Sequence, residues 1–163
     1  MTEKNVLIFQ GGWDGHEPVK VAARFAKLME KNGYTCKIYD NQEVLLDLDL
    51  LMRQDLIIPC WTMGKIDAAA RANIVKAVAA GTGLAGCHGG MCDAFREDVE
   101  WQFMTGGQWV SHPGGDGISY RLISARDPAL LWKVWRISRY AANNIICMWI
   151  RQTRFCSLLS YFQ

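Results

Sequence analysis

The stretch that decides the fold is NVLIFQGG, residues 5–12. It is a short run of apolar side chains that ends at two consecutive glycines. Such a run is typical of a strand inside a parallel sheet, because both faces of that strand are covered. The next segment, His16-Glu17-Pro18, supplies an acid and a proline, which favour the first turn of a helix. The sequence therefore predicts a strand followed by a helix near the start of the chain.

The same alternation of strand and helix continues toward the middle of the chain. Alternation of this kind implies right-handed crossovers and a parallel sheet with helices on both faces. We therefore expect a three-layer α/β fold, incomplete toward its carboxyl end. The expected strands are residues 5–10, 35–39, 56–61, 83–87 and 118–123, and the expected helices are residues 18–32, 44–52 and 67–80 and a short one that starts at Asp93.

Composition and charge exclude several classes of protein. A chain of 163 residues with 50% apolar residues supports one domain with a sizeable core. The net charge of +2 is too small to imply a nucleic-acid or membrane partner. No secretory signal precedes the first strand, and no apolar run reaches the roughly 20 residues of a membrane span. The six cysteines form no CxxC pair, which indicates buried reduced thiols in a cytoplasmic protein.

The charge balance changes abruptly at Pro128. Residues 129–163 contain five basic side chains and no acid, so we divide the chain into an α/β domain, residues 1–128, and a basic tail, residues 129–163. One hypothesis is that this tail is aberrant because it is encoded out of frame. The alternative is a helical appendage over residues 130–150, in which apolar side chains form a stripe.

The three histidines are the first candidates for chemistry. His16 and His88 each follow the end of an expected strand, and His112 lies in a glycine-rich stretch, residues 106–115, that we expect to be a loop. Histidine is the usual side chain for proton transfer near neutral pH and a common metal ligand. The three could act together, with Asp14 or Glu17 orienting one of them, or could hold a divalent metal ion. The competing interpretation is three unrelated surface histidines.

The segment GCHGG, residues 86–90, has the form of a nucleophile elbow, with a central side chain between glycines. The central residue is His88, which makes it the leading acid–base candidate. Cys87 is the alternative nucleophile, and in that case Ala85 replaces the first glycine of the motif. The motifs that bind dinucleotides or the phosphates of nucleotides are absent.

Four tryptophans are candidates for stacking on the flat face of a sugar: Trp13, Trp61, Trp101 and Trp109. Trp13 and Trp109 are favoured, because they lie in glycine-rich segments, whereas Trp61 is more typical of a core. Gly12, Gly89 and Gly90 complete the expected substrate-binding set, since a ligand can approach the backbone closely at glycine.

Three separated motifs carry a family resemblance: GGWDGH at residues 11–16, GLAGCH at residues 83–88, and GGQW at residues 106–109 followed by His112-Pro113. With these motifs, residues 5–128 resemble the trehalose-utilisation (ThuA-like) family. The resemblance implies a flavodoxin-like fold similar to class I glutamine amidotransferases, with a histidine where those enzymes carry their cysteine nucleophile. It also implies a role in the metabolism of trehalose or related disaccharides.

Three functions follow as expectations. The first is an enzyme, a hydrolase or isomerase acting on a sugar derivative, with His88 as acid–base and a carbohydrate as its small-molecule partner. The second is a carbohydrate-binding domain without catalysis, which uses Trp13 and Trp109. The third is a glutaminase-like hydrolase that uses Cys87, and the histidine at the elbow argues against it. An inactive product of the altered tail and a homo-oligomer are further expectations that the sequence leaves open.

Overall fold

The computed structural model describes residues 4–111, 119–121, 139–141 and 146–149. The chain divides into two compact units, one of residues 1–108 with 149–163 and the other of residues 109–148. The first of these units contains the main sheet and the candidate site.

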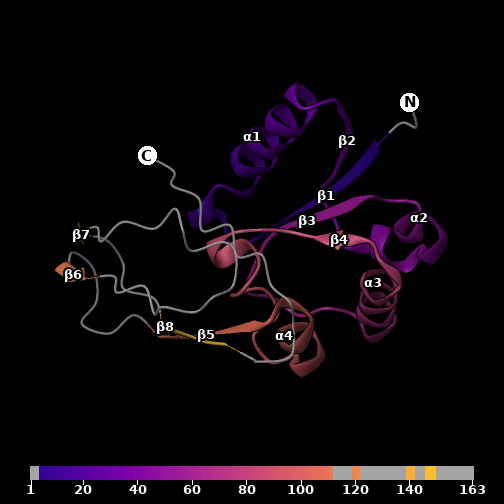
Figure 1. Ribbon diagram of the computed structural model, residues 1–163. Coiled ribbons are helices and arrows are strands. Elements are labelled where there is room, and N and C mark those ends of the chain that lie inside the picture. Colours follow the sequence, from indigo (N-terminus) through magenta and orange to yellow (C-terminus); the bar gives the residue numbers. More distant parts are fainter. Residues whose placement is uncertain (1–3, 112–118, 122–138, 142–145, 150–163) are drawn as a thin grey trace, which may run out of the picture. The chain divides into compact units, whose positions relative to one another are not determined.

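The first unit is built on a four-stranded parallel sheet (Figure 1). The strand order is β2-β1-β3-β4, which reproduces the first four positions of the flavodoxin-like order 2-1-3-4-5. The predicted α/β class with a parallel sheet is therefore confirmed. The strands are β1 (Lys4–Gly12), β2 (Tyr34–Tyr39), β3 (Leu56–Thr62) and β4 (Gly83–Leu84), and the helices are α1 (Pro18–Lys31), α2 (Leu48–Met52), α3 (Ala68–Ala80) and α4 (Val99–Thr105).

Both faces of β1 are buried, as its continuous apolar run predicts. Val6 and Ile8 pack with Ala22 and Ala26 of α1 on one face. The residues between them on β1 turn to the opposite face, because side chains alternate along a strand. Figure 1 shows α2, α3 and α4 on that side of the sheet. The larger cluster there contains Leu7, Phe9, Leu51, Ile57, Ile74, Phe95 and Trp101.

The ends of the helices follow local signals in the sequence. Pro18 occupies the first turn of α1, where its missing N–H removes no helical hydrogen bond. The Asp67 carboxylate accepts hydrogen bonds from the backbone N–H groups of Ala69 and Ala70 and so caps α3. Gly81, at φ +121°, ends the same helix.

Three expected elements differ from the structure. The helix expected over residues 44–52 is broken into a short 3₁₀ helix, η2 (Glu43–Leu46), and α2, because the Asp47 side chain caps the second piece. β4 is two residues long, and pairing persists one residue further, where Ala85 N–H donates to the Ile57 carbonyl at 3.1 Å. The helix expected at Asp93 begins at Val99, since Asp98 caps it.

The remaining strands form two pairs outside the main sheet. β5 (Gly107–Ser111) pairs with β8 (Ile146–Trp149), so the expectation of a loop there is wrong over residues 107–111. β6 (Ser119–Arg121) lies within the strand expected at residues 118–123, but it pairs antiparallel with β7 (Arg139–Ala141).

Two short strands, β7 and β8, lie in the segment that we describe as the basic tail. The helical alternative for residues 130–150 is wrong at β7 and β8, which are strands. The proposed boundary at Pro128 and most of the tail lie outside the described residues. Within the described residues, the structure contains no helix whose length and apolar character would let it cross a bilayer.

Candidate functional site

The candidate site lies at the carboxyl ends of β1 and β3, where the order of the strands reverses. Ligands of open α/β sheets bind outside the sheet at this position, the topological switch point. The loop after β1 contains η1 (Asp14–His16), a single 3₁₀ turn, and the chain after β4 contains η3 (His88–Gly90), another such turn. The topology therefore brings His16 and His88 to one edge of the sheet, as their places after strand ends predict.

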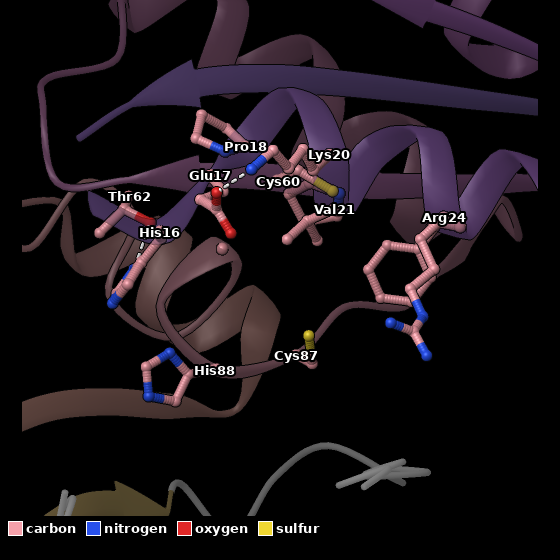
Figure 2. A pocket seen from close by; sticks show the side chains of 13 residues that line it. His16, Glu17, Pro18, Lys20, Val21, Arg24, Cys60, Thr62, Cys87 and His88 are labelled. Atoms are coloured by element: carbon pink, nitrogen blue, oxygen red, sulfur yellow. Dashed lines mark hydrogen bonds and ion pairs between the residues drawn. The ribbon is translucent and has the colours of Figure 1, made fainter. Parts of the chain in front are cut away.

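The two histidines are in contact. The centroids of the His16 and His88 rings are 4.8 Å apart, and the ring planes meet at 69°. On its other side the His16 ring meets Trp13, with centroids 4.8 Å apart and planes at 68°. Figure 2 shows His88 below His16 at the same end of the pocket. His88 is exposed and His16 is half-buried, so the pair stands between the protein interior and solvent.

Thr62 fixes the position of His16. Its Oγ1 lies 2.9 Å from Nδ1 of the His16 ring, and its side chain is 2% exposed. Its backbone carbonyl also accepts a hydrogen bond from the N–H of Trp13, at 3.1 Å. The close approach of the two strand ends requires glycine at position 12. The φ of Gly12 is +80°, and an added Cβ would lie 2.1 Å from the Thr62 carbonyl oxygen.

The backbone at His88 adopts an unusual conformation. Its φ is +48°, in the left-handed region that residues other than glycine seldom occupy. Hydrogen bonds hold the turn closed, since Gly90 N–H donates to the Cys87 carbonyl at 3.1 Å and Cys92 N–H donates to the His88 carbonyl at 3.0 Å. Strained backbone of this kind occurs preferentially at functional sites, because the surrounding structure must hold it in place.

Gly89 and Gly90 let this turn pack against the rest of the site. A Cβ on Gly89 would lie 2.4 Å from Cε1 and 2.5 Å from Nδ1 of His16. A Cβ on Gly90 would lie 3.2 Å from the Cα of Cys60 on β3. Gly89 therefore has no room for a side chain while the His16 ring stays in place, and at Gly90 a side chain would fit tightly against the strand.

A cavity of about 540 Å³ opens beside the two histidines. This volume lies within the range of small-molecule sites, about 300–1,000 Å³. Its walls come from the start of α1, the end of β3 and the turn after β4 (Figure 2). The described residues that line it are His16, Glu17, Pro18, Lys20, Val21, Arg24, Phe25, Pro59, Cys60, Thr62, Cys87, His88 and Gly90.

The two thiols in the cavity wall are held in their neutral form. Burial raises the pKa of Cys60 to about 12, and the nearby Cys87 adds to this effect. Burial also raises the pKa of Cys87 above its ordinary value. Because the thiolate is the nucleophilic form of cysteine, this environment makes Cys87 a poor nucleophile near neutral pH.

The structure places several of the predicted residues at the cavity. His16, His88 and Gly90 line it, and Gly89 and Trp13 each lie against the His16 ring. Glu17 also lines it, and its carboxylate forms an ion pair with Lys20.

Three other predicted residues are not among the described residues that line the cavity. Asp14 is exposed and is not among the lining residues. His112 lies outside the described residues, and Trp109 belongs to the unit of residues 109–148.

Two of the tryptophans belong to the core. Trp101 is fully buried, its ring meets Phe9 and Phe95, and its Nε1 donates to the Met91 carbonyl at 3.0 Å. Its candidacy as a sugar-stacking residue is therefore wrong, because no face of its ring is accessible. Trp61 is partly buried between the same two phenylalanines, which agrees with the core interpretation of that residue.

Sequence reasoning missed the residues that complete the cavity, above all Thr62 and Arg24. Neither belongs to a recognisable motif. The available signal for Thr62 is its place just after an expected strand that ends at the same edge as His16. The available signal for Arg24 is its spacing of four residues from Lys20, about one turn further along the helix that follows the histidine loop.

Two of the three histidines proposed as metal ligands, His16 and His88, lie side by side. Among the residues that the structure describes, no group of three or more His, Cys, Asp or Glu side chains is arranged to hold a metal ion. The third proposed ligand, His112, is not among those residues, so a metal site of His16, His88 and His112 stays a prediction.

The fold and the site together define an α/β protein with a histidine-bearing cavity at its switch point. The family model described as trehalose utilisation (ThuA) matches residues 5–137. The chain therefore belongs to the trehalose-utilisation family, as its three motifs predict. No curated protein and no solved structure matches the chain.

Proposed function

We propose that the protein is an enzyme of trehalose or related disaccharide utilisation that acts on a sugar derivative, with His88 as its acid–base residue. The family membership supports the pathway class. The single observation that carries an enzymatic role is the contact between the His16 and His88 rings at the edge of the cavity. An imidazole can accept or donate a proton near neutral pH, and here two of them meet at the edge of the cavity. This arrangement suits the transfer of a proton to and from a bound substrate.

The backbone of the turn supports His88 as the central residue rather than Cys87. In a nucleophile elbow the reactive side chain stands on a strained turn between strand and helix. His88 has the left-handed φ of +48°, whereas Cys87 is extended at φ −142°. We infer an amidotransferase-like turn in which an imidazole takes the place of the thiol.

His16 acts in this proposal as the partner that Thr62 orients. The hydrogen bond between Nδ1 of His16 and Oγ1 of Thr62 holds the ring in one orientation. In a neutral imidazole the other nitrogen, Nε2, accepts a proton when Nδ1 carries one and donates a proton when Nδ1 does not. The pair can then divide the roles of acid and base between the two rings.

The experiment is replacement of His88 by Asn and by Ala in the full chain. Asn tolerates left-handed backbone and cannot transfer protons, so it separates chemistry from backbone strain. We expect His88→Asn to lower turnover of disaccharide derivatives by about 10²–10⁴-fold with an unchanged melting temperature. Asn41→Ala, at an exposed turn away from the cavity, is the control that retains activity. Full activity in His88→Asn would refute the acid–base role.

A carbohydrate-binding domain without catalysis is the second candidate, and the exposure of Trp13 favours it. The Trp13 side chain is 50% exposed beside His16, so one part of its ring is accessible for stacking on a sugar. Sugar-dependent quenching of tryptophan fluorescence that Trp13→Ala abolishes, with no product formed, would support this function over the enzyme.

Two further parts of the proposal follow from the thiols. A glutaminase-like reaction through Cys87 is disfavoured, because burial raises the pKa of that thiol. Four of the described cysteines form no disulfide: Cys36, Cys60, Cys87 and Cys92. Cysteines without disulfides are typical of reducing compartments, which supports our inference of a cytoplasmic protein.

A further inference from the structure

The side chain of Glu17 belongs to the cavity and does not cap its own helix. Glu17 is the N-cap residue of α1, and its side chain makes no capping hydrogen bond. It forms an ion pair with Lys20, which lies three residues further along the chain, and both residues line the cavity. Figure 2 shows the Glu17 carboxylate between His16 and Lys20, with one oxygen joined to Lys20 and the other pointing into the open part of the pocket.

The backbone of Glu17 is strained in the same way as that of His88. Its φ is +47°, in the left-handed region that residues other than glycine seldom occupy. Four non-glycine residues in the described part of the chain have a positive φ, and two of them, Glu17 and His88, line the cavity. Because strain of this kind occurs preferentially at functional sites, it supports a role for Glu17 in the cavity beside that of His88.

The ion pair between Glu17 and Lys20 has hydrogen-bonding capacity left for a ligand. A carboxylate offers about four acceptor sites and an ammonium offers three donors, whereas this contact joins one oxygen and one nitrogen. Both side chains are more than half exposed, so a ligand in the cavity can reach them. The two charges balance each other, so the pair by itself does not select an ion. A hydroxyl group suits the pair, because it both donates and accepts a hydrogen bond.

Apolar side chains lie in the same cavity wall. Val21 follows Lys20 on α1, and Pro59 lies on β3. Ligand pockets typically combine an apolar wall with a few polar groups that fix the orientation of the ligand. A sugar matches this combination, since the face of its ring carries C–H groups and its edge carries hydroxyl groups.

We propose that Glu17 and Lys20 together bind two neighbouring hydroxyl groups of the substrate, so that the site selects a sugar with a free vicinal diol. The Glu17 carboxylate accepts a hydrogen bond from one hydroxyl, and the Lys20 ammonium donates one to the oxygen of the next. This inference rests on the proposed function, because it names the part of the sugar that the same site recognises. Since Glu17 directly follows His16, binding of the diol places the adjacent part of the sugar at the two histidines.

The test is isothermal titration calorimetry on the full chain with trehalose, glucose, 2-deoxyglucose, 3-deoxyglucose and 4-deoxyglucose. We expect the loss of one of these hydroxyls to weaken binding about tenfold, as for a hydrogen bond to a charged group. Glu17→Gly removes the carboxylate and adopts left-handed backbone without strain. In that variant the same deoxy sugar should bind as tightly as glucose, which is the coupling that a double-mutant cycle detects. Lys20→Met should remove the preference for a neighbouring hydroxyl.

Two further variants serve as comparisons. Glu17→Gln retains an acceptor oxygen and loses the charge, so its preference should lie between those of the unaltered protein and Glu17→Gly. Glu97→Gln is the matched control, because Glu97 also forms an exposed ion pair with a lysine, Lys65, and neither of those residues is among the described ones that line the cavity. This control should retain the full preference.

The probes separate failure of the inference from failure of the proposed function. Equal binding of glucose and all three deoxy sugars overturns the inference and leaves the proposed function intact, since turnover in the His88 variants tests that function separately. A preference that persists in both Glu17→Gly and Lys20→Met overturns the inference as well, because the ion pair then only stabilises the start of α1. If neither glucose nor trehalose binds, both the inference and the proposed function fail.

Discussion

At the scale of a single residue, Thr62 is the side chain on which the candidate site depends most. It is almost completely buried, and it joins the two loops through its side chain, which bonds His16, and its carbonyl, which bonds Trp13. Thr62 contacts the His16 ring, and that ring lies between Thr62 and His88 (Figure 2). We therefore regard Thr62 as a positioning residue. Its replacement tests whether the orientation of His16 matters.

Thr62→Val keeps the shape of the side chain and removes its hydroxyl. We expect turnover to fall about tenfold, since one hydrogen bond contributes about 1 kcal/mol and the His16 ring is no longer held in one orientation. The measurement is the pH profile of turnover, which should change in shape as well as height. Thr62→Ser retains the hydroxyl and should restore the profile, and an unaltered profile in Thr62→Val would exclude the positioning role.

At the scale of the element, Gly89 allows the turn η3 to pack directly against the His16 ring. The sequence pattern predicts a tight turn at residues 86–90, and the structure shows what the turn packs against. Gly89 has no close backbone obstacle at its added Cβ, and the nearest atoms belong to the His16 ring. A side chain added at position 89 therefore meets the His16 ring first.

Gly89→Ala should destabilise the protein by about 1–3 kcal/mol, because the new methyl group overlaps the His16 ring. Urea unfolding measures this loss. His16→Ala removes the ring, so the double variant Gly89→Ala/His16→Ala should recover much of the loss, a coupling that a double-mutant cycle detects. Additive effects of the two substitutions on the free energy of unfolding would show that the contact between residue 89 and the His16 ring does not cause the loss of stability.

At the scale of the whole molecule, the buried thiol of β3 makes the folded state sensitive to alkaline pH. Burial raises the pKa of Cys60 from 9.0 to about 12, so the folded protein retains a proton that the unfolded chain releases at lower pH. This contribution to stability is fully present below about pH 9 and is lost as the pH rises toward about 12. The raised pKa of Cys87 acts in the same direction.

We expect the free energy of unfolding to fall between about pH 8 and about pH 10.5, measured by urea unfolding under reducing conditions. Cys60→Ala lacks the titrating thiol, so its stability should fall less over the same interval. The comparison concerns the two slopes, since the substitution also changes packing. Identical slopes for the two proteins would contradict the assigned environment of Cys60.

The main sheet was largely predictable because its signals are local. The apolar run at residues 5–10, the Asp67 cap and the Gly81 end of α3 each depend on a few neighbouring residues, and the structure confirms all three. The break in the helix expected over residues 44–52 comes from the local cap at Asp47. Other errors occur where a distant contact overrides the local pattern. The expected helix at Asp93 is one such case, since that side chain is buried and paired with Arg96, and its carbonyl accepts the N–H of Met63.

By itself the sequence determined the α/β class, the family and the two histidines at strand ends, because strand periods, helix caps and glycine turns depend on residues close together in the chain. Tertiary structure alone decided which side chains meet. His16 and Thr62 are 46 residues apart in sequence and share a hydrogen bond, and Arg24 reaches the same cavity from a helix face. The physical reason is that contacts across a sheet depend on the order of its strands, and no local pattern specifies which distant side chain will lie opposite.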